Sequence, residues 1–210
     1  MSQTKQFSFL TLLLLLISVS FKISSQPSQQ TILVFGDSLS AAYNMPVEKG
    51  WVNLLNEKLI ENKSIFETRN ASISGETTSG GLQRFLKQVE ISKPKIVILE
   101  LGANDGLRGF DLNTTRSNLN KMIQISQEHH AKVLLAGIQI PPNYGRSYTR
   151  AFNQIFTDLA KKESVSLIPF ILEGVATDYS LIQKDRLHPN EQGQKVIVET
   201  VWKNLLPLIE

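Results

Sequence analysis

Five short runs of apolar and β-branched residues are spaced along the chain after residue 30, and each is short enough to form a strand. Longer segments, in which apolar residues recur every three or four positions, separate these runs, and a fifth such segment follows the last run. The strand-like runs are Thr31 to Phe35, Ile65 to Ala71, Ile96 to Leu101, Val133 to Ile138 and Val165 to Phe170. The alternation predicts five strands, each followed by a helix.

Each helical segment carries one apolar stripe that we expect to pack in the core. The stripes are Trp51, Leu54, Leu55 and Leu59; Leu82, Phe85, Leu86 and Val89; Leu119, Met122 and Ile123; Phe152, Ile155, Phe156 and Leu159; and Ile197, Val201, Leu205 and Leu208. Asn190 follows Pro189 just before the last stripe, and we expect its side chain to cap the final helix.

The order of these elements predicts an α/β fold. Strands joined by helical crossovers pair in parallel, and nearly continuous apolar strands are typical of a sheet covered on both faces. Because such crossovers are right-handed, the expected architecture is a three-layer αβα sandwich around a five-stranded parallel sheet. Ligands bind at the carboxyl ends of the strands in such sheets, so reactive residues should closely follow strands.

Residues 1–30 follow a different pattern, that of a secretory signal peptide. A short start containing Lys5 precedes the almost wholly apolar Phe7 to Phe21, and Lys22 to Gln30 is polar and serine-rich. The apolar part is about fifteen residues long, shorter than the roughly twenty that span a bilayer. We predict a signal peptide over residues 1–25, a single domain over 26–210, export to the periplasm or the medium, and no stable membrane insertion afterwards. An uncleaved anchor is the alternative.

Charge and cysteine content exclude several functional classes. Residues 31–210 hold 20 basic and 19 acidic side chains, because Lys5 and Lys22 precede them without an acidic residue, and no basic stripe interleaved with aromatics indicates nucleic-acid binding. The chain has no cysteine, so the core must stabilise the fold without disulfides. The histidines and carboxylates lack the spacing of a metal site, so we expect neither metal nor cofactor. Nothing in the sequence requires more than a monomer.

A Gly-Asp-Ser-Leu turn directly follows the first predicted strand, at residues 36–39. Ser38 would present its hydroxyl at the mouth of the strand, and such a hydroxyl becomes a nucleophile near neutral pH when a base lies beside it. The alternative is that Ser38 only caps a following helix. We expect Asp37 to bond the backbone of the turn.

The histidine best placed to be that base is His188, in an Asp-x-x-His-Pro segment that starts at Asp185. An aspartate three positions earlier can accept the Nδ1 hydrogen and fix the tautomer, while Pro189 keeps His188 extended. The alternative is a turn before a helix, with a solvent-exposed histidine. His129 and His130 end another predicted helix, where exposed carbonyls are their expected partners.

Two further residues follow predicted strands. Asn104 lies between small residues just past the third strand, where its amide could donate to a substrate oxyanion or stabilise its own turn. Gly75 follows the second strand, and it is either an ordinary turn residue or a bare N–H that faces a ligand.

These four blocks, in this order over the whole chain after the leader, resemble the SGNH (GDSL) hydrolase family. Segments 70–75, 104–110 and 143–146 are similar to one branch, the small periplasmic thioesterases, proteases, arylesterases and lysophospholipases of Gram-negative bacteria. The resemblance implies the flavodoxin-like SGNH-hydrolase fold and a triad of Ser38, Asp185 and His188. It further implies oxyanion donors at Ser38, Gly75 and Asn104, and a segment 106–111 that moves over the bound acyl group.

We predict a serine hydrolase that cleaves small-molecule esters and thioesters through an acyl-serine. A carbohydrate O-deacetylase on the same fold and a non-catalytic periplasmic binding module are the alternatives. Apolar residues in the predicted loops favour acyl chains of medium length over sugars. The predicted substrate contacts are Leu107, Phe110, Ile140, Pro141 and Tyr144.

Overall fold

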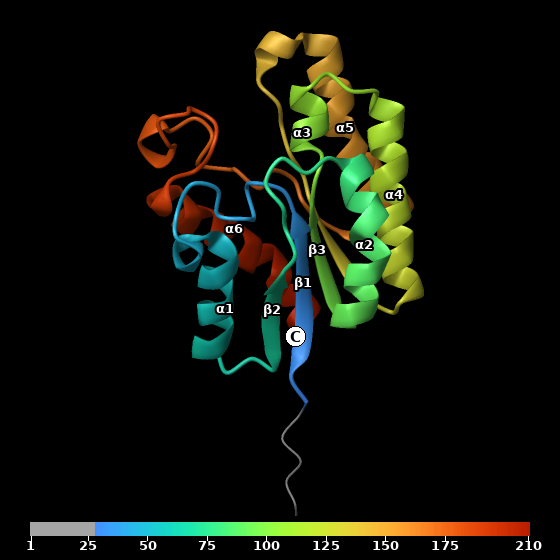
Figure 1. Cartoon of the computed structure of the whole chain (residues 1–210), viewed down its shortest axis with the longest axis vertical. Helices are drawn as coiled ribbons and strands as arrows, with labels where there is room; N and C mark the ends of the chain where they lie inside the picture. Colours follow the sequence, from blue (N-terminus) through green and yellow to red (C-terminus); the bar gives the residue numbers. More distant parts are fainter. Residues whose placement is uncertain (1–27) are drawn as a thin grey trace, which may run out of the picture.

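The computed structural model describes residues 28–210, in which strands and helices alternate along the chain (Figure 1). The strands are β1 (Gln30–Gly36), β2 (Phe66–Asn70), β3 (Ile96–Glu100), β4 (Lys132–Ala136) and β5 (Ser166–Ile168). The α-helices are α1 (Trp51–Glu61), α2 (Thr78–Ser92), α3 (Ala103–Leu107), α4 (Leu112–Glu128), α5 (Arg146–Lys162) and α6 (Glu191–Ile209). Three short 3-10 helices are η1 (Val47–Lys49), η2 (Pro142–Tyr144) and η3 (Tyr179–Leu181).

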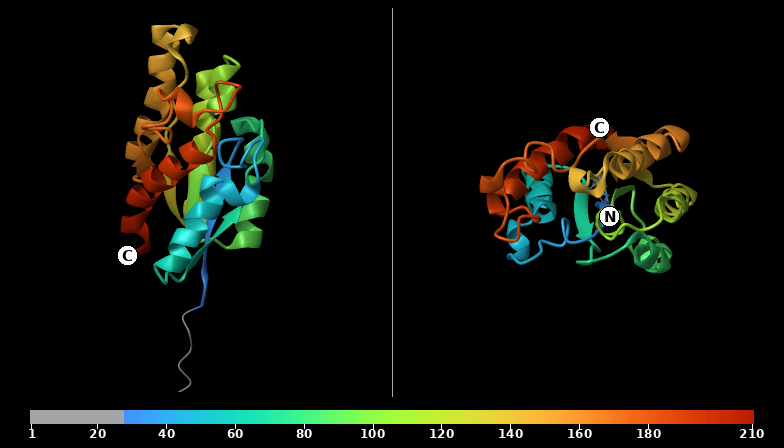
Figure 2. Two further views of the ribbon diagram at one scale, coloured as in Figure 1. Left: turned by 90° about the vertical axis from the view of Figure 1, so that its left-hand side faces the viewer. Right: turned by 90° about the horizontal axis from the view of Figure 1, so that it is seen from above.

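All five strands are parallel and lie in the order β2-β1-β3-β4-β5. Helices α1 and α6 contact each other on one face of the sheet, and α2, α4 and α5 follow one another across the other face (Figures 1 and 2). The predicted three-layer αβα sandwich and five-stranded sheet are thereby confirmed, and the strand order is that of flavodoxin-like folds.

The central strands are buried on both sides, whereas the edge strand β2 is not. Every residue of β3 is buried, and so are residues 32–36 of β1. In β2, only Phe66 is fully buried, while Glu67 and Arg69 keep contact with solvent. An edge strand pairs on one side only, so its polar residues can remain hydrated, which explains why this run was the least apolar of the five.

The predicted apolar stripes face the core, with one exception. Leu86 of α2 is 44% exposed, because Phe85 and Val89 of the same helix point toward the sheet and turn Leu86 outward. The predicted cap at Asn190 is confirmed, since its side chain accepts hydrogen bonds from the N–H groups of Gln192 and Gly193.

The predicted signal peptide over residues 1–25 lies outside the described residues. Among residues 28–210, no helix is both long enough and apolar enough to cross a membrane.

A buried leucine and an exposed leucine provide a matched test of which residues form the core. Leu99 of β3 is fully buried, so Leu99→Ala should lower the free energy of unfolding by about 2–5 kcal/mol, through lost burial and a cavity. Leu86→Ala, on the outer side of α2, should cost less than about 1 kcal/mol. Urea unfolding of both variants measures the difference, and equal losses would contradict this assignment of the core.

Candidate active site

The predicted reactive residues meet at the carboxyl edge of the sheet, the upper edge in Figure 1. Ser38 follows β1, Gly75 lies between β2 and α2, and Asn104 lies in the first turn of α3 after β3. Asp185 and His188 lie in the long segment between β5 and α6. The parallel arrangement of the strands brings these five residues, from four loops, to one edge.

Ser38, His188 and Asp185 form a continuous hydrogen-bonded chain. The Ser38 Oγ lies 2.8 Å from His188 Nε2, and His188 Nδ1 lies 2.7 Å from Asp185 Oδ2. With the Nδ1 hydrogen directed at the carboxylate, Nε2 is free to accept the serine hydrogen. In this arrangement the imidazole can act as a base toward the hydroxyl, while the carboxylate orients the imidazole.

The carboxylate of Asp185 is held in place by its own loop. Its Oδ1 accepts hydrogen bonds from the backbone N–H groups of Leu187 and His188, both at 3.0 Å. Partial burial raises the pKa of Asp185, but the two N–H groups and the imidazole outweigh burial, so the pKa lies below its ordinary value. Asp185 is thus kept as an anion beside the imidazole.

The loop that carries the base is joined to the loop that carries the nucleophile, a contact that the motifs did not predict. The Gln183 side chain donates to the Tyr43 carbonyl and to the Pro189 carbonyl, both at 3.0 Å. The Gln183 N–H also donates to the His188 carbonyl at 2.7 Å, and the Tyr43 ring lies 4.3 Å from the imidazole, centroid to centroid. Tyr43 and Gln183 are 140 positions apart, and neither stands in a recognisable pattern.

Ser38 lies in a series of turns, and no helix starts there. The first helical element after β1 is η1 at Val47, so the alternative in which Ser38 caps a following helix is excluded. As predicted, Asp37 bonds the turn, since its Oδ1 accepts the Leu39 N–H at 3.0 Å. Trp51 of α1 supports the same turn by donating its indole N–H to the Leu39 carbonyl at 3.1 Å.

The Asn104 amide nitrogen is oriented toward the turn at residues 36–39 and does not bond its own turn. Its Nδ2 donates to Asp37 Oδ2 at 3.1 Å, which occupies one of its two hydrogens and leaves the other for a ligand. Gly75 adopts a φ of 79°, a conformation that favours glycine. Arg108 contacts both residues, since its Nη2 lies 3.2 Å from the Gly75 carbonyl and 3.5 Å from Asn104 Oδ1.

Two buried carboxyl groups, Asp37 and Glu100, lie beneath the nucleophile. Glu100 Oε2 accepts hydrogen bonds from the Ser40 hydroxyl at 2.7 Å and from the Asp37 N–H at 3.3 Å, while Glu100 Oε1 is buried without a partner. Burial first, and the charge of Asp37 second, raise the pKa of Glu100 well above its ordinary value. Burial also raises the pKa of Asp37 to about 7, although bonds from Leu39 and Asn104 oppose this effect.

A cavity of about 600 Å³ opens directly beside these groups. Ser38, Gly75, Asn104 and His188 line it together. Apolar and aromatic side chains from the loops after β3, β4 and β5 form most of the remaining wall. They include Leu107, Ile138, Ile140, Pro141, Pro142, Phe170, Leu172, Tyr179, Ile182 and Leu187.

Three of the five predicted substrate contacts line this cavity, and two do not. Leu107, Ile140 and Pro141 are in its wall, whereas Phe110 and Tyr144 are outside it. The Tyr144 hydroxyl instead donates to the Leu107 carbonyl at 2.8 Å. Apolar character and a loop position were thus insufficient to identify which residues face the cavity.

The segment 106–111, which the family resemblance implied to move over the acyl group, contains one packed and one open glycine. Gly106 belongs to α3, and a Cβ there would lie 2.8 Å from atoms of Ile140 and Phe152, so close packing explains this glycine. Gly109 has a φ of 66° and open space around it. The Tyr148 hydroxyl anchors the segment by donating to the Phe110 carbonyl at 2.9 Å.

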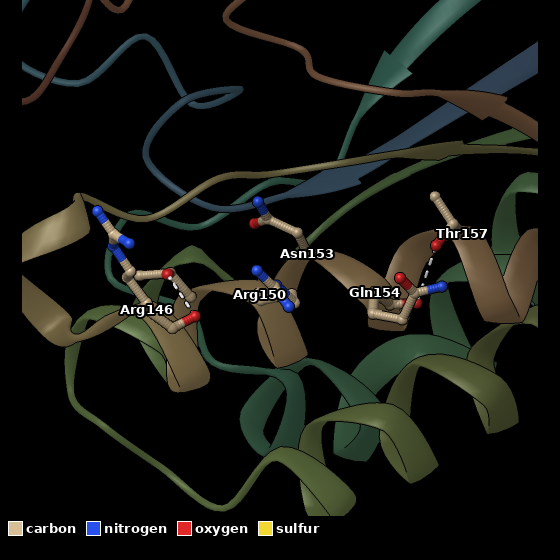
Figure 3. Close-up of a pocket in the computed structure, with 6 residues that line it drawn as sticks. Arg146, Arg150, Asn153, Gln154 and Thr157 are labelled. Atoms are coloured by element: carbon tan, nitrogen blue, oxygen red, sulfur yellow. Dashed lines mark hydrogen bonds between the residues drawn. The ribbon is translucent and has the colours of Figure 1, made fainter.

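A second hollow, of about 420 Å³, lies on the surface of α5. Figure 3 shows Arg146, Arg150, Asn153, Gln154 and Thr157 following one another along this helix. The hollow lacks a nucleophile paired with a base. Across residues 28–210, no three His, Asp or Glu side chains lie close enough together to bind a metal ion. Of the two hollows, the cavity beside Ser38 is the one that holds a hydroxyl paired with an imidazole, so it is the candidate active site.

Comparison with known proteins agrees with this geometry. Residues 34–196 match the model of the GDSL-like Lipase/Acylhydrolase family, which covers more than half of the chain. The chain belongs to the GDSL (SGNH) hydrolase family. It is an ester-hydrolysing enzyme of that family, as the sequence predicted.

Relatives with high coverage carry esterase names. The chain is 43% identical over 195 residues to an arylesterase of Vibrio mimicus, covering 93% of this chain and 97% of the relative. It is 39% identical over 196 residues to thioesterase 1/protease 1/lysophospholipase L1 of Escherichia coli K12, with coverages of 93% and 91%. The crystal structure of TesA superposes with a TM-score of 0.83 at 44% identity, covering 85% of this chain and 99% of that one.

The buried carboxyl groups predict how stability depends on pH. Because burial raises the pKa of Asp37 to about 7 and also raises that of Glu100, the folded protein holds protons that the unfolded chain releases. The free energy of unfolding should therefore fall as the pH rises from about 5 to about 7. Glu100→Gln should reduce this slope by up to about 1.4 kcal/mol per pH unit, the maximum for one proton.

Urea unfolding at a series of pH values measures the slope. Glu90→Gln, a change in an exposed carboxyl of α2, is the matched control and should leave the slope unchanged. A slope in Glu100→Gln equal to that of the wild type would mean that Glu100 is already ionised in the folded protein.

Proposed function

We propose that this enzyme cleaves carboxylic esters and thioesters by a serine mechanism in which Ser38 is the nucleophile. The observation that carries the proposal is the unbroken chain from Ser38 through His188 to Asp185, with distances of 2.8 and 2.7 Å. His188 removes the hydroxyl hydrogen as Ser38 attacks the acyl carbonyl, and Asp185 stabilises the imidazolium that forms. His188 then protonates the leaving alcohol or thiol, and water activated by the same imidazole releases the acid.

The tetrahedral intermediate requires hydrogen-bond donors, and we assign these to the Ser38 N–H, the Gly75 N–H and the Asn104 amide. All three residues line the same cavity. The second hydrogen of the Asn104 amide is available because Asp37 binds only one. One such donor typically lowers the barrier by about 3–4 kcal/mol, so the three account for a large share of catalysis.

The acyl group is proposed to bind between Leu107, Ile140 and Pro141. These residues make one wall of the cavity apolar, which suits a hydrocarbon chain of medium length better than a sugar. Because of this wall, we favour aryl esters, thioesters and lysophospholipids as substrates over carbohydrate O-acetyl groups. The names of the relatives include the same three substrate types. The proposed reaction needs no metal or organic cofactor.

Export is a further part of the proposal. It rests on the order of cationic, apolar and serine-rich segments in residues 1–25, followed by one domain over 26–210. The enzyme would act there as a monomer on small molecules.

Removing the nucleophile should abolish turnover. Ser38→Ala should lower kcat for p-nitrophenyl butyrate by at least about a thousandfold. Asp185→Asn should lower kcat by roughly a hundredfold to ten-thousandfold, because the imidazole loses its orienting anion. Ser92→Ala at the far end of α2 and Asp158→Asn on α5 are the matched controls, with kcat unchanged. Retained turnover in Ser38→Ala would rule out an acyl-serine.

The apolar wall predicts the preferred acyl length. Across p-nitrophenyl acetate, butyrate, hexanoate and octanoate, kcat/KM should rise, because each buried methylene contributes up to about 0.8 kcal/mol. Leu107→Ala should weaken the preference for octanoate and leave acetate unaffected, whereas Leu86→Ala, outside the cavity, should change neither. Fastest turnover of acetate would instead favour the O-deacetylase.

A further inference from the structure

The segment 176–188 contributes one charged residue to the wall of the cavity. Arg186 lines the cavity together with Tyr179 and Leu187 of the same segment. Among the residues that line this cavity in the described part of the chain, Arg186 is the only one with a fixed charge at neutral pH. The lining contains no carboxylate. The cavity therefore presents one cation to a ligand.

The guanidinium of Arg186 is free to bind a ligand. Within residues 28–210, it takes part in no ion pair and donates no hydrogen bond to another side chain or carbonyl. Both carboxylates of the segment 176–188 have partners of their own, because Asp185 is bound by His188 and Asp178 accepts from Ser180. The other cation of the loop, Lys184, is exposed and does not line the cavity.

The position of Arg186 indicates that it lies near the leaving group of the substrate. His188 must come within hydrogen-bond distance of the leaving oxygen or sulfur in order to protonate it. Arg186 precedes His188 by two residues, so their Cα atoms lie within about 7 Å of each other. A leaving group that His188 protonates therefore comes close to the segment that carries Arg186.

The backbone at Arg186 is unusual for a long side chain. Its φ is 60°, in the left-handed region, where a Cβ is unfavourable and glycine is not. Among residues 28–210, six other non-glycine residues share a positive φ, so the angle alone indicates nothing. Arg186 differs from Lys63 and Lys93 among them because it lies in the loop of the base and lines the cavity.

We propose that Arg186 is a specificity-determining residue that binds a negative charge on the leaving group. The preferred substrates would be acyl esters or thioesters of an alcohol, phenol or thiol that carries a phosphate or carboxylate. This inference rests on the proposed function and adds the chemical class of the leaving group. A guanidinium forms charge-assisted hydrogen bonds with either anion, so the shared chemistry is the anionic group.

The test compares two chromogenic esters that differ by one charge, o-nitrophenyl octanoate and the same ester with a carboxylate on the ring. At low ionic strength, Arg186→Gln should lower kcat/KM for the carboxylate ester about fivefold relative to the neutral ester. Arg186→Lys should retain most of the preference. Added salt should reduce the preference of the wild type and leave that of Arg186→Gln unchanged.

Lys184→Gln is the matched control, since it removes a cation from the same loop outside the cavity, and its ratio of the two rates should equal that of the wild type. Arg186→Gly relieves the positive φ, so it should keep or raise the Tm while losing the preference, which separates charge from folding.

Two results would overturn the role of Arg186: an unchanged ratio in Arg186→Gln, or an equal change in Lys184→Gln. In both cases, turnover of the neutral ester that depends on Ser38 would leave the proposed function intact. A wild type that hydrolyses neither ester would refute both.

Discussion

Parallel pairing of β1 with β3 aligns Gly36 with Glu100, and the geometry of the site follows from this register. Ser38 comes two residues after the first of these positions, and Asn104 comes four residues after the second. The two side chains are therefore neighbours because the strands end together, whatever the loops beyond them do. The Asp37 side chain, which accepts from the Asn104 amide at 3.1 Å, completes the alignment across the gap.

The same register places the Glu100 carboxyl in a buried position next to Gly36. Gly36 has no side chain because a Cβ there would lie 2.8 Å from the Ser40 hydroxyl and equally close to the Glu100 carbonyl. The space that glycine leaves is filled by the Glu100 carboxyl, which contacts no cation. Burial of a carboxyl without a cationic partner favours its neutral form, which explains the raised pKa of Glu100.

Much of the fold followed from local patterns. Apolar strands such as β3 and amphipathic helices such as α5 are set by burial, which operates on residues close in sequence. The convergence of Ser38 and His188 could be predicted because each stands in a short motif whose residue types serve one chemistry.

Contacts that depend on packing between distant segments could not be predicted from local patterns. Gln183 joins the two catalytic loops through ordinary amide hydrogen bonds, which any exposed glutamine could form. The sequence pattern also does not show which way some large side chains point. A small rotation of the helix or loop backbone decides whether Leu86, Phe110 and Tyr144 face the interior or solvent. Gly106 looks like a hinge in the sequence, and only its distant neighbours Ile140 and Phe152 identify it as a packing position.

The hydrogen bond between Ser38 and His188 spans 150 positions, and the Gln183 contacts that support it span nearly as many. A chain still emerging from the ribosome contains the serine long before it contains the imidazole. Until the final segment has been synthesised and α6 has docked on the sheet, the Ser38 hydroxyl cannot form its hydrogen bond to His188. Under the proposed mechanism, the nascent polypeptide is therefore inert toward the esters around it.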